Sequence, residues 1–194
     1  MDFNFDYIIV GAGSAGCVLA NRLSHDEDHT VLLIESGGWD NNPWIHIPLG
    51  YGKHFDNPKV NWMYHSEPEQ ATGGRMIFQP RGKVIGGSSS INGLVYIRGQ
   101  KQDFDLWDPG SRYGWDYNSI LPYFKKSEKN MDIQDQYHGS DGELSVSSPK
   151  DLHPLAASFV KAGINTGYPL NEDFNGVTQE GFGHLQMTIN NGLR

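Results

Sequence analysis

The feature that most constrains this chain is a glycine-rich run at residues 11–16, Gly-Ala-Gly-Ser-Ala-Gly, directly after the apolar stretch Tyr7–Val10. Apolar residues at helical spacing follow it up to Leu23, and a second apolar stretch covers Thr30–Ile34. Short apolar runs of this kind are typical of strands buried on both faces. Strand, glycine turn, helix and strand within roughly thirty residues predict a βαβ unit and therefore an α/β fold with a parallel sheet.

In this setting the glycine run predicts a dinucleotide site. Gly13 has no Cβ, so a pyrophosphate can lie against the backbone at the helix N-terminus, where free N–H groups and the helix dipole favour an anion. Glu35 ends the second strand, where a carboxylate can accept hydrogen bonds from ribose hydroxyls and disfavours a 2′-phosphate, so NADP is not expected. The pattern alone leaves NAD and FAD open. The candidate residues are Gly11, Ala12, Gly13, Ser14, Ala15, Gly16 and Glu35.

A second glycine- and serine-rich segment lies within residues 80–105 and helps to distinguish the two cofactors. Gly86–Ser90 stands between the apolar pair at 84–85 and the apolar residues of 91–97. A flexible linker would have no such flanks, so a loop that wraps a ligand with backbone donors is favoured. Gly86 and Gly87 allow close approach, while Ser88 and Asn92 supply side-chain hydrogen bonds.

With these segments in view, the sequence resembles the glucose–methanol–choline (GMC) family of FAD-dependent oxidoreductases. The resemblance is carried by residues 6–16 with Glu35, by residues 82–92 continuing to Tyr96, Gly99 and Asp105, and by residues 138–144. It spans essentially the whole chain and is strongest to the branch of choline-dehydrogenase-like and aliphatic alcohol dehydrogenases. The implied fold is a Rossmann-like FAD-binding βαβ unit with the start of an α+β substrate domain, incomplete without C-terminal sequence.

The resemblance also implies roles for individual residues. Residues 11–15 would hold the pyrophosphate and Glu35 the adenosine ribose. Some relatives carry a histidine with a covalent flavin bond at the position of Ile91, so FAD is expected to bind non-covalently here. Trp62 is expected either near the cofactor or as a core tryptophan. The loop positions that match the flavin side, or the signature around it, are Gly82, Gly87, Ser88, Asn92, Gly93 and Val95.

The activity implied by the resemblance is oxidation of a primary alcohol to an aldehyde by hydride transfer to the flavin N5. In the family the base is a histidine in the C-terminal part of a longer chain, so no catalytic residue is assigned within these 194 residues. A missing segment or a companion chain would supply that base. The alternatives are a non-catalytic FAD-binding fragment or subunit, and an NAD-dependent dehydrogenase, which the loop at 86–92 argues against.

Composition excludes several other classes. The chain has 15 Lys+Arg against 23 Asp+Glu, a net charge of −8, which argues against nucleic-acid binding. No apolar stretch approaches the ~20 residues needed to span a bilayer, although loose membrane association stays open. One cysteine, Cys17, suggests the cytoplasm. The eight histidines show no metal-ligand spacing and are expected on the surface or in loops. The sequence contains no GxSxG motif, so a serine hydrolase is not expected.

The predicted organisation is an FAD-binding domain over residues 1–150, including the flavin loop at 80–105, and the start of a substrate domain over 151–194. Asp116 is expected to N-cap a helix, and residues 143–148 alternate as a half-buried strand does. Pro154 is expected to open a helix through about Thr166. Its predicted inner face carries Leu155, Phe159 and Ala162.

Overall fold

The computed structural model describes residues 4–194, which form two compact units. The first unit contains the described residues up to Gly93 together with Gly192–Arg194, and the second contains Leu94–Asn191. Each unit is described by itself. No helix among the described residues is long and apolar enough to cross a bilayer. The predicted domain boundary at residue 150 concerns the domains of the whole protein and stays a prediction.

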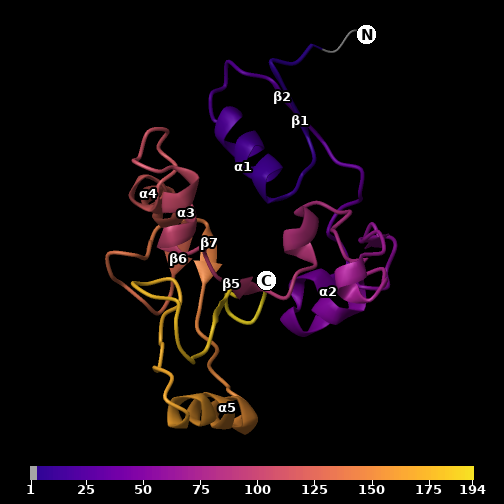
Figure 1. Ribbon diagram of the computed structural model, residues 1–194. Coiled ribbons are helices and arrows are strands. Elements are labelled where there is room, and N and C mark those ends of the chain that lie inside the picture. Colours follow the sequence, from indigo (N-terminus) through magenta and orange to yellow (C-terminus); the bar gives the residue numbers. More distant parts are fainter. Residues whose placement is uncertain (1–3) are drawn as a thin grey trace. The chain divides into compact units, whose positions relative to one another are not determined.

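The first unit opens with the predicted βαβ element. Strand β1 (Tyr7–Val10) leads into helix α1 (Ser14–Leu23) and then into strand β2 (Val31–Ile34). The strands pair in parallel, with Tyr7 opposite Val31 and Val10 opposite Ile34. Figure 1 shows α1 running alongside the two strands. The α/β fold class predicted from the glycine run is confirmed.

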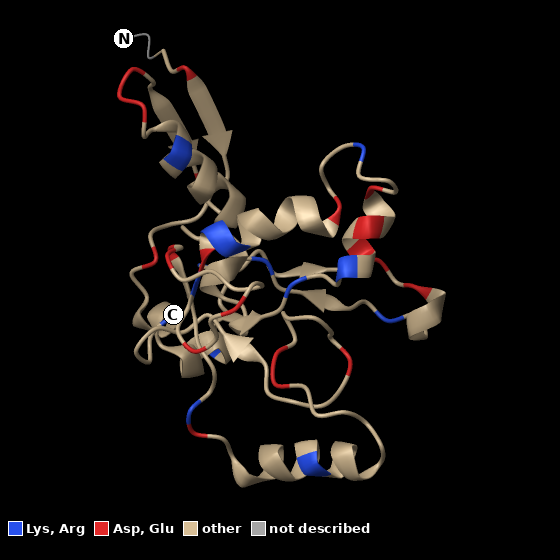
Figure 2. Ribbon diagram, turned by 90° about the vertical axis from the view of Figure 1, so that its left-hand side faces the viewer, with Lys and Arg blue, Asp and Glu red and all other residues tan. Residues whose placement is uncertain are grey.

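The strands of this element have little covering them within the described residues. Ile9 is buried, whereas Ile8 is 60% exposed and Val10 is 83% exposed. Helix α1 has no buried residue, and Val18 and Leu19 on its surface are both more than half exposed. Figure 2 shows that β1 and β2, beside the N-terminus, carry no charged residues. The fold is expected to be incomplete without C-terminal sequence, and the exposure of these apolar strands within residues 4–194 agrees with that expectation.

The rest of the first unit is built from short elements around a small apolar core. They are α2 (Pro43–His46), the 3-10 helices η1 (Pro48–His54), η2 (Gln70–Thr72) and η3 (Gly87–Ser90), and the antiparallel strands β3 (Tyr64–His65) and β4 (Phe78–Gln79). The core cluster comprises Ile45, Val60, Val84 and Ile91. Val84 and Ile91 flank the glycine- and serine-rich loop, so its apolar flanks anchor it as the sequence predicted.

The second unit contains two separate strand pairs and three helices. Strand β5 (Val95–Tyr96) pairs antiparallel with β8 (Gln186–Met187), and β6 (Glu128–Asn130) pairs in parallel with β7 (Leu144–Val146). The helices are α3 (Lys101–Trp107), α4 (Tyr117–Ser127) and α5 (Pro154–Asn165). Asp116 N-caps α4 as predicted, because its carboxylate accepts from the N–H groups of Asn118 and Ser119.

The predicted inner face of α5 is largely exposed among the described residues, although the Phe159 ring packs against that of Phe182 with centroids 5.3 Å apart. Leu155 is 71% exposed and Phe159 is 67% exposed, and Ala162 is exposed as well. The buried residues of the helix are Val160 and Gly163. A Cβ on Gly163 would lie 2.4 Å from the ring of Phe182, so this glycine provides the space for an aromatic side chain from a distant part of the unit.

Candidate cofactor site

The site begins at the turn between β1 and α1. The Gly11 N–H donates to the Ile34 carbonyl at 2.7 Å, and Gly11 has a φ of +99°, which favours glycine. Helix α1 begins at Ser14, so the N–H groups of Ser14, Ala15 and Gly16 have no intrahelical acceptor. These donors and the helix dipole favour an anion at this end of α1.

Two glycines of this turn have opposite surroundings. A Cβ on Gly16 would lie 1.8 Å from the Gly11 carbonyl oxygen, so Gly16 allows the helix to pack against the turn. A Cβ on Gly13 would meet nothing closer than the Cα of Gly87 at 4.0 Å. The backbone of Gly13, with φ −77° and ψ −172°, also suits any residue. The space in front of Gly13 is therefore open to a ligand.

The carboxylate of Glu35 is held by two backbone N–H groups. One oxygen accepts from Ala12 at 2.8 Å and the other from Gly37 at 2.9 Å. Each carboxylate oxygen has a second lone pair, so the side chain can still accept from ribose hydroxyls. Glu35 therefore also links the glycine turn to the segment that follows β2.

The glycine- and serine-rich loop meets the glycine turn directly. The Gly86 N–H donates to the Ala12 carbonyl at 2.7 Å, and a Cβ on Gly87 would lie 2.8 Å from the Cα of Gly13. Gly82 is equally close to the loop, since its added Cβ would lie 2.0 Å from the Gly87 oxygen. The two glycine-rich segments, which are distant in sequence, thus pack backbone to backbone, and this contact leaves no room for a Cβ at Gly87.

A cavity of about 490 Å³ lies along this contact within the first unit. Its wall includes Trp62 and Tyr64, whose rings stack in parallel with centroids 5.7 Å apart. Lys83 lies 4.8 Å above the Trp62 ring, and Arg81 adds a second cation to this region. The predicted residues that line the cavity are Gly11, Gly13, Glu35, Gly82, Gly87 and Ser88.

The remaining predicted residues have other places. Ala12, Ser14, Ala15 and Gly16 form the turn and the first turn of α1, beside the cavity. Asn92 and Gly93 follow η3 in the same unit but do not line the cavity, and Val95 lies on β5 in the second unit. Their roles toward a cofactor stay predictions. Sequence reasoning missed Tyr64 and Arg81 as cavity residues, although the Trp-x-Tyr alternation and the arginine before Gly82 were visible signals.

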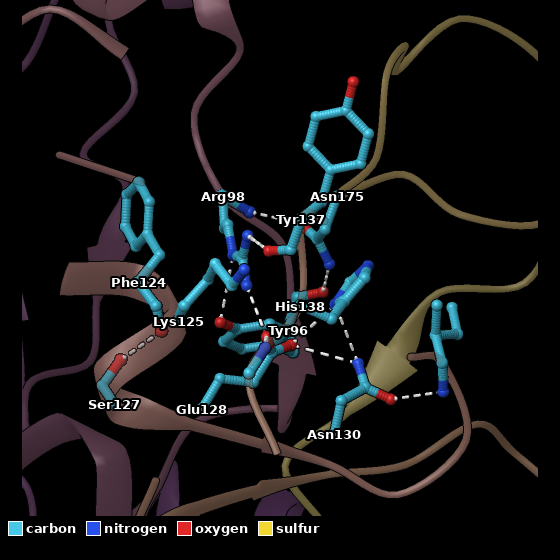
Figure 3. A network of polar contacts seen from close by, with 12 residues as sticks. Tyr96, Arg98, Phe124, Lys125, Ser127, Glu128, Asn130, Tyr137, His138 and Asn175 are labelled. Carbon is cyan, nitrogen blue, oxygen red and sulfur yellow. Dashed lines mark hydrogen bonds and ion pairs between the residues drawn. The ribbon is translucent and has the colours of Figure 1, made fainter. Parts of the chain in front are cut away.

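The second unit holds a buried polar network that sequence reasoning also missed (Figure 3). Arg98 donates to Glu128 at 2.6 Å, and the other Glu128 oxygen lies 3.0 Å from Nδ1 of His138. Nε2 of His138 lies 2.9 Å from Asp173. Burial acts to lower the pKa of His138, but the hydrogen bonds to Asp173 and Glu128 outweigh it and raise this pKa to about 9. The imidazole is therefore a buried cation between two carboxylates.

The histidines are expected on the surface or in loops. His138 does lie in the loop between β6 and β7 but is only 5% exposed, whereas His54 is fully buried in η1 and contradicts the expectation. Asp135, His138 and Asp173 offer atoms within 4.8 Å of one another, a spacing that a metal ion could use. In the structure both ring nitrogens of His138 face carboxylates, Nδ1 that of Glu128 and Nε2 that of Asp173.

Comparison with known proteins adds to this geometry. The family description "GMC oxidoreductase" matches residues 5–194. The chain is 48% identical over 196 residues to an oxygen-dependent choline dehydrogenase of Vibrio vulnificus (strain YJ016), a match that covers 100% of this chain and 35% of the relative. It is 50% identical over 191 residues to an alcohol dehydrogenase [acceptor] of Pseudomonas putida, covering 98% of this chain and 35% of the relative.

Among solved structures, pyridoxine 4-oxidase from Mesorbium loti matches with a TM-score of 0.89 and 37% identity, covering 98% of this chain and 38% of that one. The chain belongs to the GMC oxidoreductase family, as the resemblance indicated. FAD as the cofactor is confirmed with it. The chain spans about a third of the length of the curated relatives that it matches.

Proposed function

We propose that these residues form the FAD-holding N-terminal part of an enzyme that oxidises an alcohol to an aldehyde. The observation that carries the proposal is the contact between Gly13 and Gly87, which brings the glycine turn and the flavin loop to one cavity. A dinucleotide cofactor needs a phosphate-binding turn and a second segment for its other end. The relatives named above are a choline dehydrogenase and an alcohol dehydrogenase, which supports an alcohol as the substrate.

Each part of the cavity suits a part of FAD. The free N–H groups of Ser14, Ala15 and Gly16 suit the pyrophosphate, and the open space at Gly13 lets it approach. Glu35 is positioned by two N–H groups with lone pairs left for the adenosine ribose. The loop from Gly82 to Gly93, together with Val95, is assigned to the flavin side. With Ile91 in place of a linking histidine, binding is non-covalent.

Bound FAD supplies an acceptor for the hydride that leaves the alcohol carbon. The substrate hydroxyl must lose a proton to a base at the same time. His138, the histidine most embedded in a polar network, is protonated and held by Glu128 and Asp173, so it does not suit that role. We assign the base to a histidine outside these 194 residues, as the family resemblance implies.

The exposed strands indicate a surface that another segment of the protein, or another chain, covers. Apolar strands of a parallel sheet need a covering layer on both faces, yet Ile8 and Val10 are largely exposed. We propose that further sequence of the protein, or a companion chain, adds strands beside β1 and β2 and covers them. The alternative function, a non-catalytic FAD-binding fragment or subunit, differs only in needing that second chain for activity. The cytoplasmic location stays a prediction.

The test uses the natural protein, including any sequence or subunit that accompanies these residues. This protein is mixed with a primary alcohol in the absence of oxygen, and the flavin absorption is followed. Loss of the visible flavin absorption upon mixing is the expected result. Flavin that binds but stays oxidised with every primary alcohol tried would favour the non-catalytic alternative. A protein that binds no flavin would contradict the proposal.

A further inference from the structure

Arg81 lines the cavity at the glycine turn and has no anionic partner. Among residues 4–194 no carboxylate lies within salt-bridge distance of its guanidinium. Within the same residues, its one side-chain hydrogen bond runs from Nη1 to the neighbouring Pro80 carbonyl at 2.7 Å. A guanidinium has five N–H donors, so most of those of Arg81 are left for a ligand.

The backbone of Arg81 is held firmly although its side chain is exposed. Its N–H donates to Oδ1 of Asn61 at 3.0 Å, and its carbonyl accepts from the N–H of Trp62 at 2.9 Å. Asn61 is itself buried, and its NH₂ group donates to the carbonyls of His54 and Phe55. The side chain of Arg81 therefore starts from a fixed point at the edge of the cavity.

A series of close backbone contacts connects Arg81 to the start of α1. The next residue, Gly82, donates its N–H to Oγ of Ser88 at 3.0 Å. A Cβ on Gly82 would lie 2.0 Å from the Gly87 oxygen, and a Cβ on Gly87 would lie 2.8 Å from the Cα of Gly13. Gly13 directly precedes the first residue of α1. Arg81 and the turn before α1 thus border one cavity, although they come from distant segments.

The charges around the cavity favour a cation at this place. A dinucleotide brings an ionised diphosphate to the start of α1, where the helix supplies the equivalent of only about +0.5 of a charge. Glu35 lines the same cavity and adds a negative charge. Arg81 is the one cation among the described residues that line the cavity. Its planar fork of N–H groups suits two phosphate oxygens at once.

We propose that Arg81 binds the diphosphate of the cofactor, which the free N–H groups at the start of α1 bind as well. This proposal rests on the proposed function, since it takes the cavity as the FAD site. The group that Arg81 recognises is an ionised phosphate oxygen. A ligand that keeps the adenosine but lacks the phosphates should therefore gain nothing from Arg81.

Three variants and three ligands test the proposal in the natural protein depleted of FAD. Arg81→Gln removes the cation, whereas Arg81→Lys keeps the charge without the planar fork. Arg75→Gln is the matched control, because Arg75 is exposed, does not line the cavity and donates from Nε to the Thr72 carbonyl. Fluorescence titration measures FAD affinity. Calorimetry measures the affinity for adenosine diphosphate (ADP), which carries the diphosphate, and for adenosine, which lacks it.

We expect Arg81→Gln to weaken the binding of FAD and of ADP roughly tenfold or more and to leave adenosine binding unchanged. Added salt should weaken ADP binding more steeply in the wild type than in Arg81→Gln, because salt screens an ion pair that the variant lacks. Arg81→Lys should fall between the wild type and Arg81→Gln, since it keeps only the charge. Arg75→Gln should change none of these affinities.

The melting temperature of cofactor-free Arg81→Gln should match that of the wild type, because the exposed side chain bonds a single carbonyl. Wild-type ADP affinity in Arg81→Gln would overturn the proposal, as would a wild-type protein that binds no ADP. An equal loss of ADP and adenosine affinity would also overturn it, since Arg81 would then act on the shape of the cavity. A wild-type protein that binds ADP but no FAD would overturn the proposed function, and the ADP comparison would still test Arg81.

Discussion

At the scale of single residues, the glycine turn shows what a sequence pattern can predict and what it cannot. Both Gly13 and Gly16 belong to the predicted dinucleotide site, and the structure places them in different surroundings. Gly16 is required for packing against the Gly11 oxygen, whereas Gly13 faces open space beside Gly87. The backbone hydrogen bonds of Glu35 could not be predicted, because they depend on where Ala12 and Gly37 lie after folding.

The glycine substitutions are expected to separate binding from folding. Gly13→Ala should unfold with a free energy within about 1 kcal/mol of the wild type, because its methyl group meets only van der Waals contact. FAD affinity should nevertheless fall at least tenfold. Gly16→Ala should lower the free energy of unfolding by more than ~2 kcal/mol because the methyl group overlaps the Gly11 oxygen. Denaturant unfolding of the cofactor-free protein measures both effects, and equal stability losses would contradict the assignment.

Glu35→Gln is expected to affect the protein even without its cofactor. The amide NH₂ must face one of the two N–H groups that Glu35 now binds, so one charge-assisted hydrogen bond is lost. We expect the free energy of unfolding to fall by about 1.5–3 kcal/mol. Glu67→Gln, at an exposed position, is the control. Unchanged thermal stability of the cofactor-free Glu35→Gln protein would show that these backbone bonds contribute nothing.

At the scale of helices and strands, local patterns predicted the existence of elements better than their surroundings. The βαβ unit and the Asp116 cap follow from apolar spacing and capping chemistry, which act within a few residues. The buried part of α5 does not, because it depends on the ring of Phe182, which packs against both Gly163 and Phe159. The sequence near α5 alone gave no sign of this distant partner.

The cap of α4 provides the prediction at this scale. Asp116 accepts from two backbone N–H groups and from the Ser119 hydroxyl at 2.5 Å, and the hydrogen bond from this hydroxyl is the main cause that lowers the pKa of Asp116. Asp116→Ala should lower the free energy of unfolding by about 1–2 kcal/mol, and Asp116→Asn should recover most of the loss. Equal stability of the alanine and asparagine variants in chemical unfolding would contradict the capping role.

At the scale of the whole molecule, the cavity and the buried network both join segments that are distant in sequence. The cavity could be predicted because each of its two segments carries its own glycine signature. The network could not, since Arg98, Glu128 and His138 meet only after folding and none is part of a local pattern. Charged residues without such a pattern are expected on the surface, which is why the burial of His138 within its loop was not predicted.

The network makes stability depend on pH. The pKa of His138 is about 9 in the folded protein and 6.5 ordinarily, so the folded state binds more protons between these values. Its contribution to stability is fully present below pH ~6.5 and is lost as the pH rises through ~9. The melting temperature should therefore fall over this range, and His138→Gln should flatten the fall. An identical pH profile in His138→Gln would contradict the account.

Hydrogen exchange of the natural protein with and without FAD tests the central claim most directly, namely that the glycine turn and the flavin loop form one FAD site. FAD should slow exchange at the N–H groups of Ser14–Gly16 and at those of residues 86–92 in the same titration, with one apparent Kd. Helix α5, in the second unit, is the internal control, and its hydrogen-exchange rates should not change when FAD is added. Protection of only one of the two segments, or of neither, would contradict the claim.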